Sequence, residues 1–184
     1  MRILIYILLI QLLLLSCKKQ SEITRSFNCK NTSFNTLEVI TDIKKIFSVE
    51  YPKNWKTNLF YDDIQSSIYT ADTTKELTKS VLLDITFINK EMNFNDYFKL
   101  KQEQDNLFKN LIQITSREIK LLKKPTYYTV SKGKKGGFSY VICNIFIKIN
   151  NQNFILAKTE VYGDYLVDER LCQGIRLIEK IKIH

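Results

Sequence analysis

The chain has 184 residues and a formal net charge of +9, and its length is sufficient for one domain with a substantial hydrophobic core. The excess of lysine and arginine indicates an anionic partner or surface, or else simply serves solubility. The only histidine is His184, the last residue. This excludes Ser-His-Asp triads, Cys-His dyads and HExxH zinc sites, because each needs an internal imidazole.

Residues 1–16 have the pattern of a lipoprotein signal peptide. The apolar run from Ile3 to Leu15 has 13 residues, which is too short to span a bilayer but suits the central region of a signal peptide. It closes on Ser16-Cys17, which resembles the lipobox of bacterial lipoproteins. We therefore expect a diacylglyceryl thioether on the Cys17 thiol, cleavage before Cys17 and acylation of its new amino group, with acyl chains such as palmitate. The alternative is an ordinary secretory signal with an incidental cysteine.

Lipidation predicts a protein of the bacterial cell envelope, anchored to a membrane by its N-terminus. Export makes nucleic acid an improbable partner and leaves lipid headgroups, acidic polysaccharide or an acidic protein. Lys18, rather than Asp, follows Cys17, which favours the outer membrane over retention at the inner membrane.

Residues 17–42 are polar and are predicted to form a tether, with a short helix at Leu37–Lys44. Of the remaining cysteines, Cys29, Cys143 and Cys172, two can pair, most readily with Cys172 as one member. The alternative is that all three stay reduced. No CxxC spacing or zinc pattern is present.

Strands follow from residue 46. Alternation predicts a strand at 46–51 that ends at Pro52, a returning strand at 55–61 and a third strand at 66–71. The segment 81–88 is apolar on both faces, so we expect cover on both sides. Asn93 or Asn95 then caps a helix whose aromatic and apolar residues are expected near one face, with Lys, Gln, Glu and Asp on the other. These residues are Phe94, Tyr97, Phe98, Phe108 and Leu111.

The second half reads as a β-meander closed by a helix. The predicted strands are 114–122, 126–131, 138–149 and 153–162, with a turn at 133–137. The final helix starts near Asp164, and its apolar stripe consists of Val167, Leu171, Ile175, Ile178 and Ile181. Two helices that enclose an antiparallel sheet make an α+β sandwich.

The stretch from Phe47 to Trp55, FSVEYPKNW, resembles the F-x-V-x-Y-P-x-x-W opening of PsbP-like domains. The order of elements over residues 46–184 is similar as well, so we assign residues 43–184 to such a domain. The resemblance implies an α/β/α sandwich that acts as a binding or assembly subunit rather than as an enzyme. It transfers no site residue and implies no cofactor.

The best candidate for a binding surface is the basic hairpin at 132–137, which lacks the P-loop pattern and lies between strands. Together with nearby tyrosines it could contact protein, glycan or an anionic polymer, although core packing is the simpler interpretation of the tyrosines. The candidate residues are Lys132, Lys134, Lys135, Tyr127 and Tyr140. Acidic residues such as Asp62 and Asp63 fit turn and helix capping better than metal binding or catalysis.

These observations predict a non-enzymatic envelope lipoprotein that binds a protein as an accessory or assembly factor. The alternative is an anchored binding protein for a small molecule, glycan or anionic polymer. A hydrolase that uses two carboxylates is a third hypothesis, and it would need a cleft where two acids meet.

Overall fold

In the computed structural model, residues 20–30, 32–34 and 36–184 are described. They form a seven-stranded antiparallel sheet with the order β3-β4-β5-β9-β8-β7-β6, and a three-stranded sheet with the order β1-β2-β10. The strands of the large sheet are β3 (Lys56–Tyr61), β4 (Gln65–Ala71), β5 (Leu82–Asn89), β6 (Leu111–Leu121), β7 (Lys124–Lys135), β8 (Phe138–Lys148) and β9 (Asn153–Tyr162). The remaining elements are β1 (Leu37–Thr41), β2 (Phe47–Pro52), β10 (Lys182–Ile183), the helices α2 (Glu22–Ser26), α3 (Asp96–Phe108) and α4 (Val167–Ile178), and the 3₁₀ turn η1 (Leu77–Lys79).

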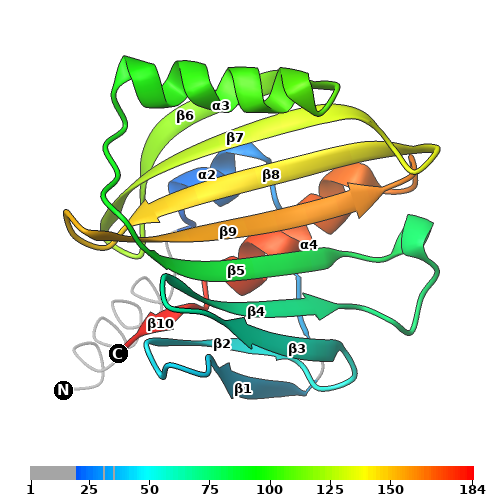
Figure 1. Cartoon of the computed structure of the whole chain (residues 1–184). Coiled ribbons are helices and arrows are strands. Elements are labelled where there is room, and N and C mark those ends of the chain that lie inside the picture. Colours follow the sequence, from blue (N-terminus) through cyan, green and yellow to red (C-terminus); the bar gives the residue numbers. More distant parts are fainter. Residues whose placement is uncertain (1–19, 31, 35) are drawn as a thin grey trace, which may run out of the picture.

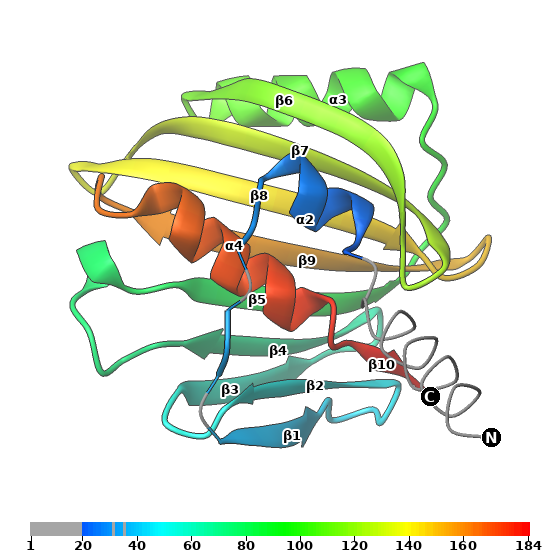
Figure 2. The same cartoon turned by 180° about the vertical axis from the view of Figure 1, so that it is seen from behind.

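The large sheet separates two unlike layers (Figures 1 and 2). Helices α4 and α2 cover one face, which we call the inner face, and α3 lies on the other, which we call the open face. The α+β sandwich predicted from the sequence is confirmed. Within the described residues, no helix is long and apolar enough to cross a membrane.

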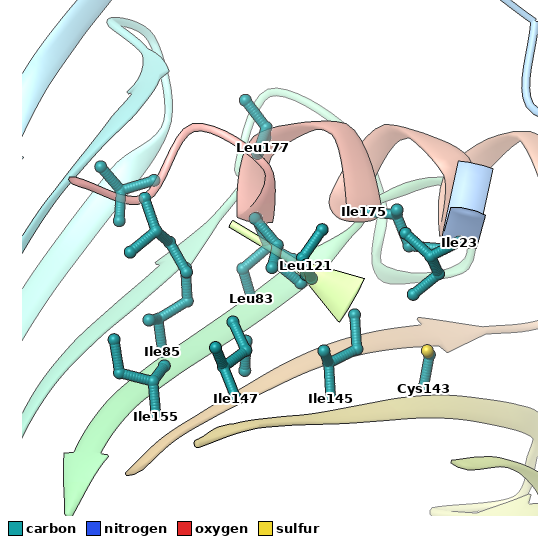
Figure 3. Packing of buried hydrophobic residues seen from close by; sticks show 14 of the residues in the cluster. Ile23, Leu83, Ile85, Leu121, Cys143, Ile145, Ile147, Ile155, Ile175 and Leu177 are labelled. Carbon is teal, nitrogen blue, oxygen red and sulfur yellow. The ribbon is translucent and has the colours of Figure 1, made fainter. Parts of the chain in front are cut away.

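The main core lies between the inner face and α4. Alternate residues of β8, namely Cys143, Ile145 and Ile147, have no exposed surface, and they pack beneath Ile175 of α4 (Figure 3). Burial of one such aliphatic side chain is worth about 1.5–3 kcal/mol. Strand β2 adds Phe47 and two further side chains to the same core.

The expected hairpin between residues 46–51 and 55–61 is wrong, although both strands exist. Strand β2 pairs with β1 on one side and with β10 on the other, so neither edge of β2 is free for β3. Trp55 instead donates its backbone N–H to the Pro52 carbonyl and buries its ring, and β3 continues into the large sheet beside β4. Such long-range pairings leave no local trace in the sequence.

The polar segment before β2 is also not the tether we expected, at least from residue 20 onward. The predicted helix at Leu37–Lys44 is the strand β1, and the short helix α2 buries Ile23 completely. Cys29 and Cys172 form a disulfide, whereas Cys143 is a buried free thiol. The polar composition of this segment gave no sign that it docks on the domain, because a few buried apolar side chains and one disulfide are enough to hold it there.

Helix α3 begins as predicted, with the side chain of Asn95 accepting a hydrogen bond from the Phe98 N–H. Phe98 packs against Tyr127 and Phe146 of the sheet. The aromatic residues of α3 differ in burial, because Tyr97 is 76% exposed and Phe108 is 86% exposed.

Candidate functional site

A tight hairpin places lysines at the end of β7. Its two turn residues, Gly136 and Gly137, have φ angles of +58° and +84°, which is the conformation of a two-residue hairpin turn and strongly favours glycine. Lys135 and Tyr140 therefore lie next to each other at the ends of paired strands, with Lys135 opposite Phe138 and Gly133 opposite Tyr140.

Glu160 of β9 gathers this hairpin into a polar cluster on the open face. The Lys135 ammonium lies 3.1 Å from the Glu160 carboxylate and 4.7 Å from the centre of the Tyr140 ring. Tyr140 donates its hydroxyl to the same carboxylate at 2.8 Å, and the ring of Tyr162 lies 4.9 Å from that of Tyr140. One carboxylate thus holds a cation and a phenol in fixed positions.

The surroundings shift the proton equilibria in this cluster. Burial, followed by the charge of Glu160, raises the pKa of Tyr140, so its hydroxyl remains a donor. Partial burial disfavours the charged form of Lys135, but hydrogen bonds to Tyr162 and Glu160 outweigh it and raise the pKa of that lysine. Both shifts favour a cationic Lys135 and a neutral, hydrogen-bond-donating Tyr140.

Beside the cluster is a hollow of about 500 Å³ between the C-terminal end of α3 and the open face. Lys158 of β9 lies in its wall and pairs with Asp84 of β5 at 2.7 Å. Among the described residues, Lys109 and Lys134 in the wall have no ion pair, so the hollow carries surplus positive charge. Its lining residues are Asn106, Lys109, Leu111, Lys134, Lys135, Tyr140, Ile142, Asn144, Lys158 and Glu160.

The structure brings together three of the five predicted surface residues, Lys134, Lys135 and Tyr140. Lys132 is exposed but is not among the residues that line the hollow. Tyr127 is buried in the aromatic cluster beneath α3 and is unavailable as a contact. The predicted lipidation site Cys17 lies outside the described residues.

Sequence reasoning missed Lys158 and Glu160. They alternate with apolar residues along β9, so the signal was a polar stripe of period two in a strand that is otherwise buried. The part that these two residues play in the site depends on the pairing of β9 with β8, which the local sequence does not show.

A second exposed feature lies on the outer side of α3. We call it the α3 ridge, and it consists of Tyr97, Leu100, Leu107 and Phe108. Their spacing places them on one stripe of the helix, turned away from the sheet. Next to α3 lies the edge strand β6, which exposes Ile112 and Ile114 and shows a register shift at Gln113 and Thr115.

The described acidic and sulfur-containing residues form no group of three that could hold a metal ion. Asp62 accepts backbone hydrogen bonds from Gln65 and Ile64, which lower its pKa. This is the turn-capping role expected for Asp62.

The fold and surface therefore define an antiparallel α+β sandwich with a partly uncovered sheet face. Neither a protein-family model nor a curated protein sequence matches the chain. Cyanobacterial PsbP (CyanoP) from Synechocystis sp. PCC 6803 has a similar structure, with a TM-score of 0.51 at 10% identity over 85% of this chain and 97% of that one. The Ran-binding protein Mog1p of Saccharomyces cerevisiae gives a TM-score of 0.50 at 10% identity, over 82% and 96% of the two chains. The chain thus has the fold of PsbP-like domains, as its FSVEYPKNW segment predicted.

Proposed function

We propose that this protein is a non-enzymatic lipoprotein of the bacterial envelope, on the outer membrane, that binds another envelope protein as an accessory or assembly factor. The observation that carries the proposal is the α3 ridge. Exposed apolar side chains that cluster on one helix stripe are typical of protein-binding surfaces rather than of solvated helices. Phe108, at 86% exposure, is its most prominent member.

The charges around the ridge are of both signs. Lys109 and Lys120 are exposed near α3 and β6, and Asp96 and Glu103 are exposed on α3 itself, all four without an ion pair among the described residues. An apolar patch with a polar rim fits a protein surface that has an apolar centre and polar surroundings.

In-cell photo-crosslinking tests the proposal. A benzophenone amino acid replaces Phe108, and the matched control carries it at Phe60, an exposed phenylalanine on the opposite edge strand β3. We expect one envelope protein to crosslink from position 108, to be absent from position 60 and to disappear when Leu107→Asp is added. The same products from both positions, or none from either, would refute a specific partner at the ridge.

The lipid anchor is a separate part of the proposal. The lipobox-like Ser16-Cys17 motivates it, and the Cys29–Cys172 disulfide supports it because structural disulfides persist in oxidising compartments outside the cytosol. Cys17→Ala should move the protein from the membrane fraction to the soluble fraction. Membrane association that survives this substitution would contradict the anchor.

The hollow beside α3 supports a second candidate function, the capture of an anionic small molecule or polymer. Lys134→Glu should weaken binding of heparin, used as a probe polyanion, in a salt-sensitive manner. Lys132→Glu is the matched control because it changes the same charge two residues away on β7, at a residue that does not line the hollow. Equal losses in both variants would indicate general electrostatic attraction and would count against a site in the hollow.

A further inference from the structure

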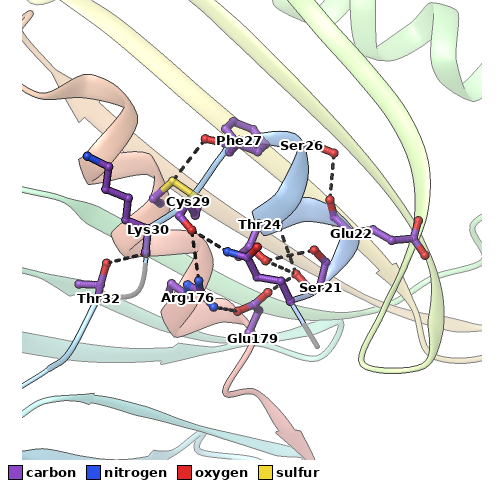
Figure 4. The surroundings of a disulfide bond; sticks show 12 residues. Ser21, Glu22, Thr24, Ser26, Phe27, Cys29, Lys30, Thr32, Arg176 and Glu179 are labelled. Carbon is purple, nitrogen blue, oxygen red and sulfur yellow. Dashed lines mark hydrogen bonds and ion pairs between the residues drawn. A yellow bond between two sulfur atoms is a disulfide. The ribbon is translucent and has the colours of Figure 1, made fainter. Parts of the chain in front are cut away.

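The segment from Gln20 to Cys29 is fastened to the body of the domain beside α4 (Figure 4). The Gln20 side chain donates to the Cys29 carbonyl at 2.7 Å, and Ser21 donates its hydroxyl to the Glu179 carboxylate. Arg176 of α4 also donates to the Cys29 carbonyl, at 3.4 Å. The segment is therefore held at both of its ends.

Burial and a covalent bond reinforce these contacts. Ile23 and Thr24 have no exposed surface, and the disulfide joins Cys29 to Cys172 on α4 with a Cα–Cα distance of 5.4 Å. From Gln20 onward, the chain is part of the domain and adds nothing to the length of a spacer.

The stretch of chain between the lipidated Cys17 and the docked segment is short. Only Lys18 and Lys19 lie between Cys17 and Gln20. Because an extended chain spans at most about 3.6 Å per residue, the Cα atom of Cys17 lies within about 11 Å of that of Gln20. Strand β7, with its 12 residues, is by comparison about 40 Å long. Acyl chains on Cys17 can reach only one end of the sandwich.

Several contacts define that end. Glu179, which binds Ser21, follows α4, and the last residue, His184, donates its backbone N–H to the Ile46 carbonyl. Lys124 donates to the Ile149 carbonyl, which joins two further turns at the same end as β10 (Figure 2). We call this the anchor end, and it consists of residues 42–46, 62–64, 122–123, 149–152 and 179–184.

We propose that the anchor end rests on the bilayer that holds the lipid of Cys17, so that the sandwich stands end-on and the 132–137 hairpin points away from the membrane. This inference rests on the proposed lipid anchor. It commits to a lipid surface as the occupant, because the reach of the chain brings the anchor end there. Exposed Ile43 and Ile64, together with Lys45 and Lys123, which form no ion pair within the part of the chain that the structure describes, suit an interface of headgroups.

The proposed orientation depends on the length of the chain between Cys17 and Gln20 more than on the charge of the anchor end. Asp62 and Asp63 lie in the same group of turns as the lysines, so the anchor end is of mixed sign. We therefore expect the same orientation on zwitterionic and anionic membranes. The lysine-lined hollow, at the C-terminal end of α3, would face a partner beyond the bilayer.

Two exposed turn asparagines provide a matched pair of probe positions. Asn151 lies at the anchor end, between β8 and β9, and Asn54 lies at the far end, between β2 and β3. The lipidated full chain, with a fluorescent amino acid at either position, is reconstituted in phosphatidylcholine vesicles that carry a headgroup quencher. We expect at least threefold stronger quenching at position 151 than at position 54. Equal quenching, or the reverse order, would overturn the orientation.

A longer spacer tests whether the short connection to Cys17 is what orients the domain. An insertion of twenty Gly and Ser residues between Lys19 and Gln20 leaves all the contacts of the docked segment in place and should reduce the quenching ratio by at least half. The variant Cys29→Ser with Cys172→Ser and Ile23→Asp should do the same, because it frees the chain as far as β1. An unchanged ratio in the insertion variant would show that the short reach does not orient the domain.

The anchor and the orientation fail separately. If the protein stays on the vesicles when Cys17→Ala prevents lipidation, both the proposed anchor and this inference are overturned. If Cys17 is required but the two probes are quenched equally, the anchor stands and only the end-on orientation is wrong.

Discussion

The two faces of the large sheet use the same strands for different purposes. Along β8, Cys143, Ile145 and Ile147 enter a sealed apolar core, while Tyr140 and Asn144 line a hollow on the open face. The inner face is covered by α4 and α2 and stapled by a disulfide, whereas α3 covers only part of the open face. Stability thus resides mainly on the inner face, which leaves the open face free to carry charged and aromatic groups.

The disulfide should be the largest single contribution on the inner side. It links residues 143 positions apart, and closure of so long a loop lowers the entropy of the unfolded chain by an amount worth about 5 kcal/mol at most. Cys29→Ser with Cys172→Ser should therefore lower the free energy of unfolding by about 3–5 kcal/mol in urea titrations. A reductant should destabilise the wild type by a similar amount and leave the double variant unchanged. Loss of less than 1 kcal/mol would mean that the packing of α2 holds the segment without the bond.

Adjacent substitutions on β8 compare the two faces directly. Ile145→Ala leaves a cavity in the core and should cost about 3 kcal/mol. Asn144→Ala, one residue away on the open face, should cost less than about 1 kcal/mol. Chemical denaturation of both variants measures the difference. Similar costs would show that the open face is as tightly packed as the inner one.

Helix α4 lies close against the inner face at Gly174. A Cβ atom there would lie 2.4 Å from Cγ2 of Thr159 and 2.9 Å from a methyl carbon of Leu83. Gly174→Ala should therefore destabilise the fold by about 2 kcal/mol through overpacking. Thr159→Ala in the same chain should recover part of that loss, since it removes the atoms that collide. Additive losses in the double variant would contradict this packing.

On the open face, Tyr140→Phe should have a modest effect. It removes the hydrogen bond to Glu160 but keeps the ring, so we expect a cost of about 1 kcal/mol in thermal unfolding. Tyr165→Phe, at an exposed site, is the control and should be silent. If both variants are as stable as the wild type, water replaces the lost hydrogen bond, and this bond does not make the cluster rigid.

The smallest expected effect is the pH dependence of the stability that Glu50 contributes at the edge of the molecule. Hydrogen bonds from Lys180 and Lys182 lower the pKa of Glu50 from its ordinary 4.5, so its contribution exists above that pH and is lost as the pH falls through the lower folded value. Glu50→Gln should cost about 0.5 kcal/mol at pH 7 and progressively less as the pH falls below 4.5. Stability curves of both proteins across this range test the sign. A larger difference in acid than at pH 7 would contradict it.

Much of the fold was predictable from local pattern. Period-two alternation located β2, β4, β5 and β9, and the apolar stripe located α4. Part of the candidate site could be predicted from the sequence, because Lys134, Lys135 and Tyr140 lie close together along the chain. Glu160 was missed because its contact with Lys135 joins residues 25 positions apart.

The sequence by itself determined most of the strands and helices from β2 onward and the period of each, since those depend on neighbours along the chain. The PsbP-like order of elements followed from the same local signals. Only the tertiary structure decided which strands pair, that Cys29 meets Cys172 and that the polar segment before β1 lies on the body of the domain. These outcomes depend on contacts between distant residues, where a few buried side chains and one disulfide outweigh the local preference of a polar segment for solvent.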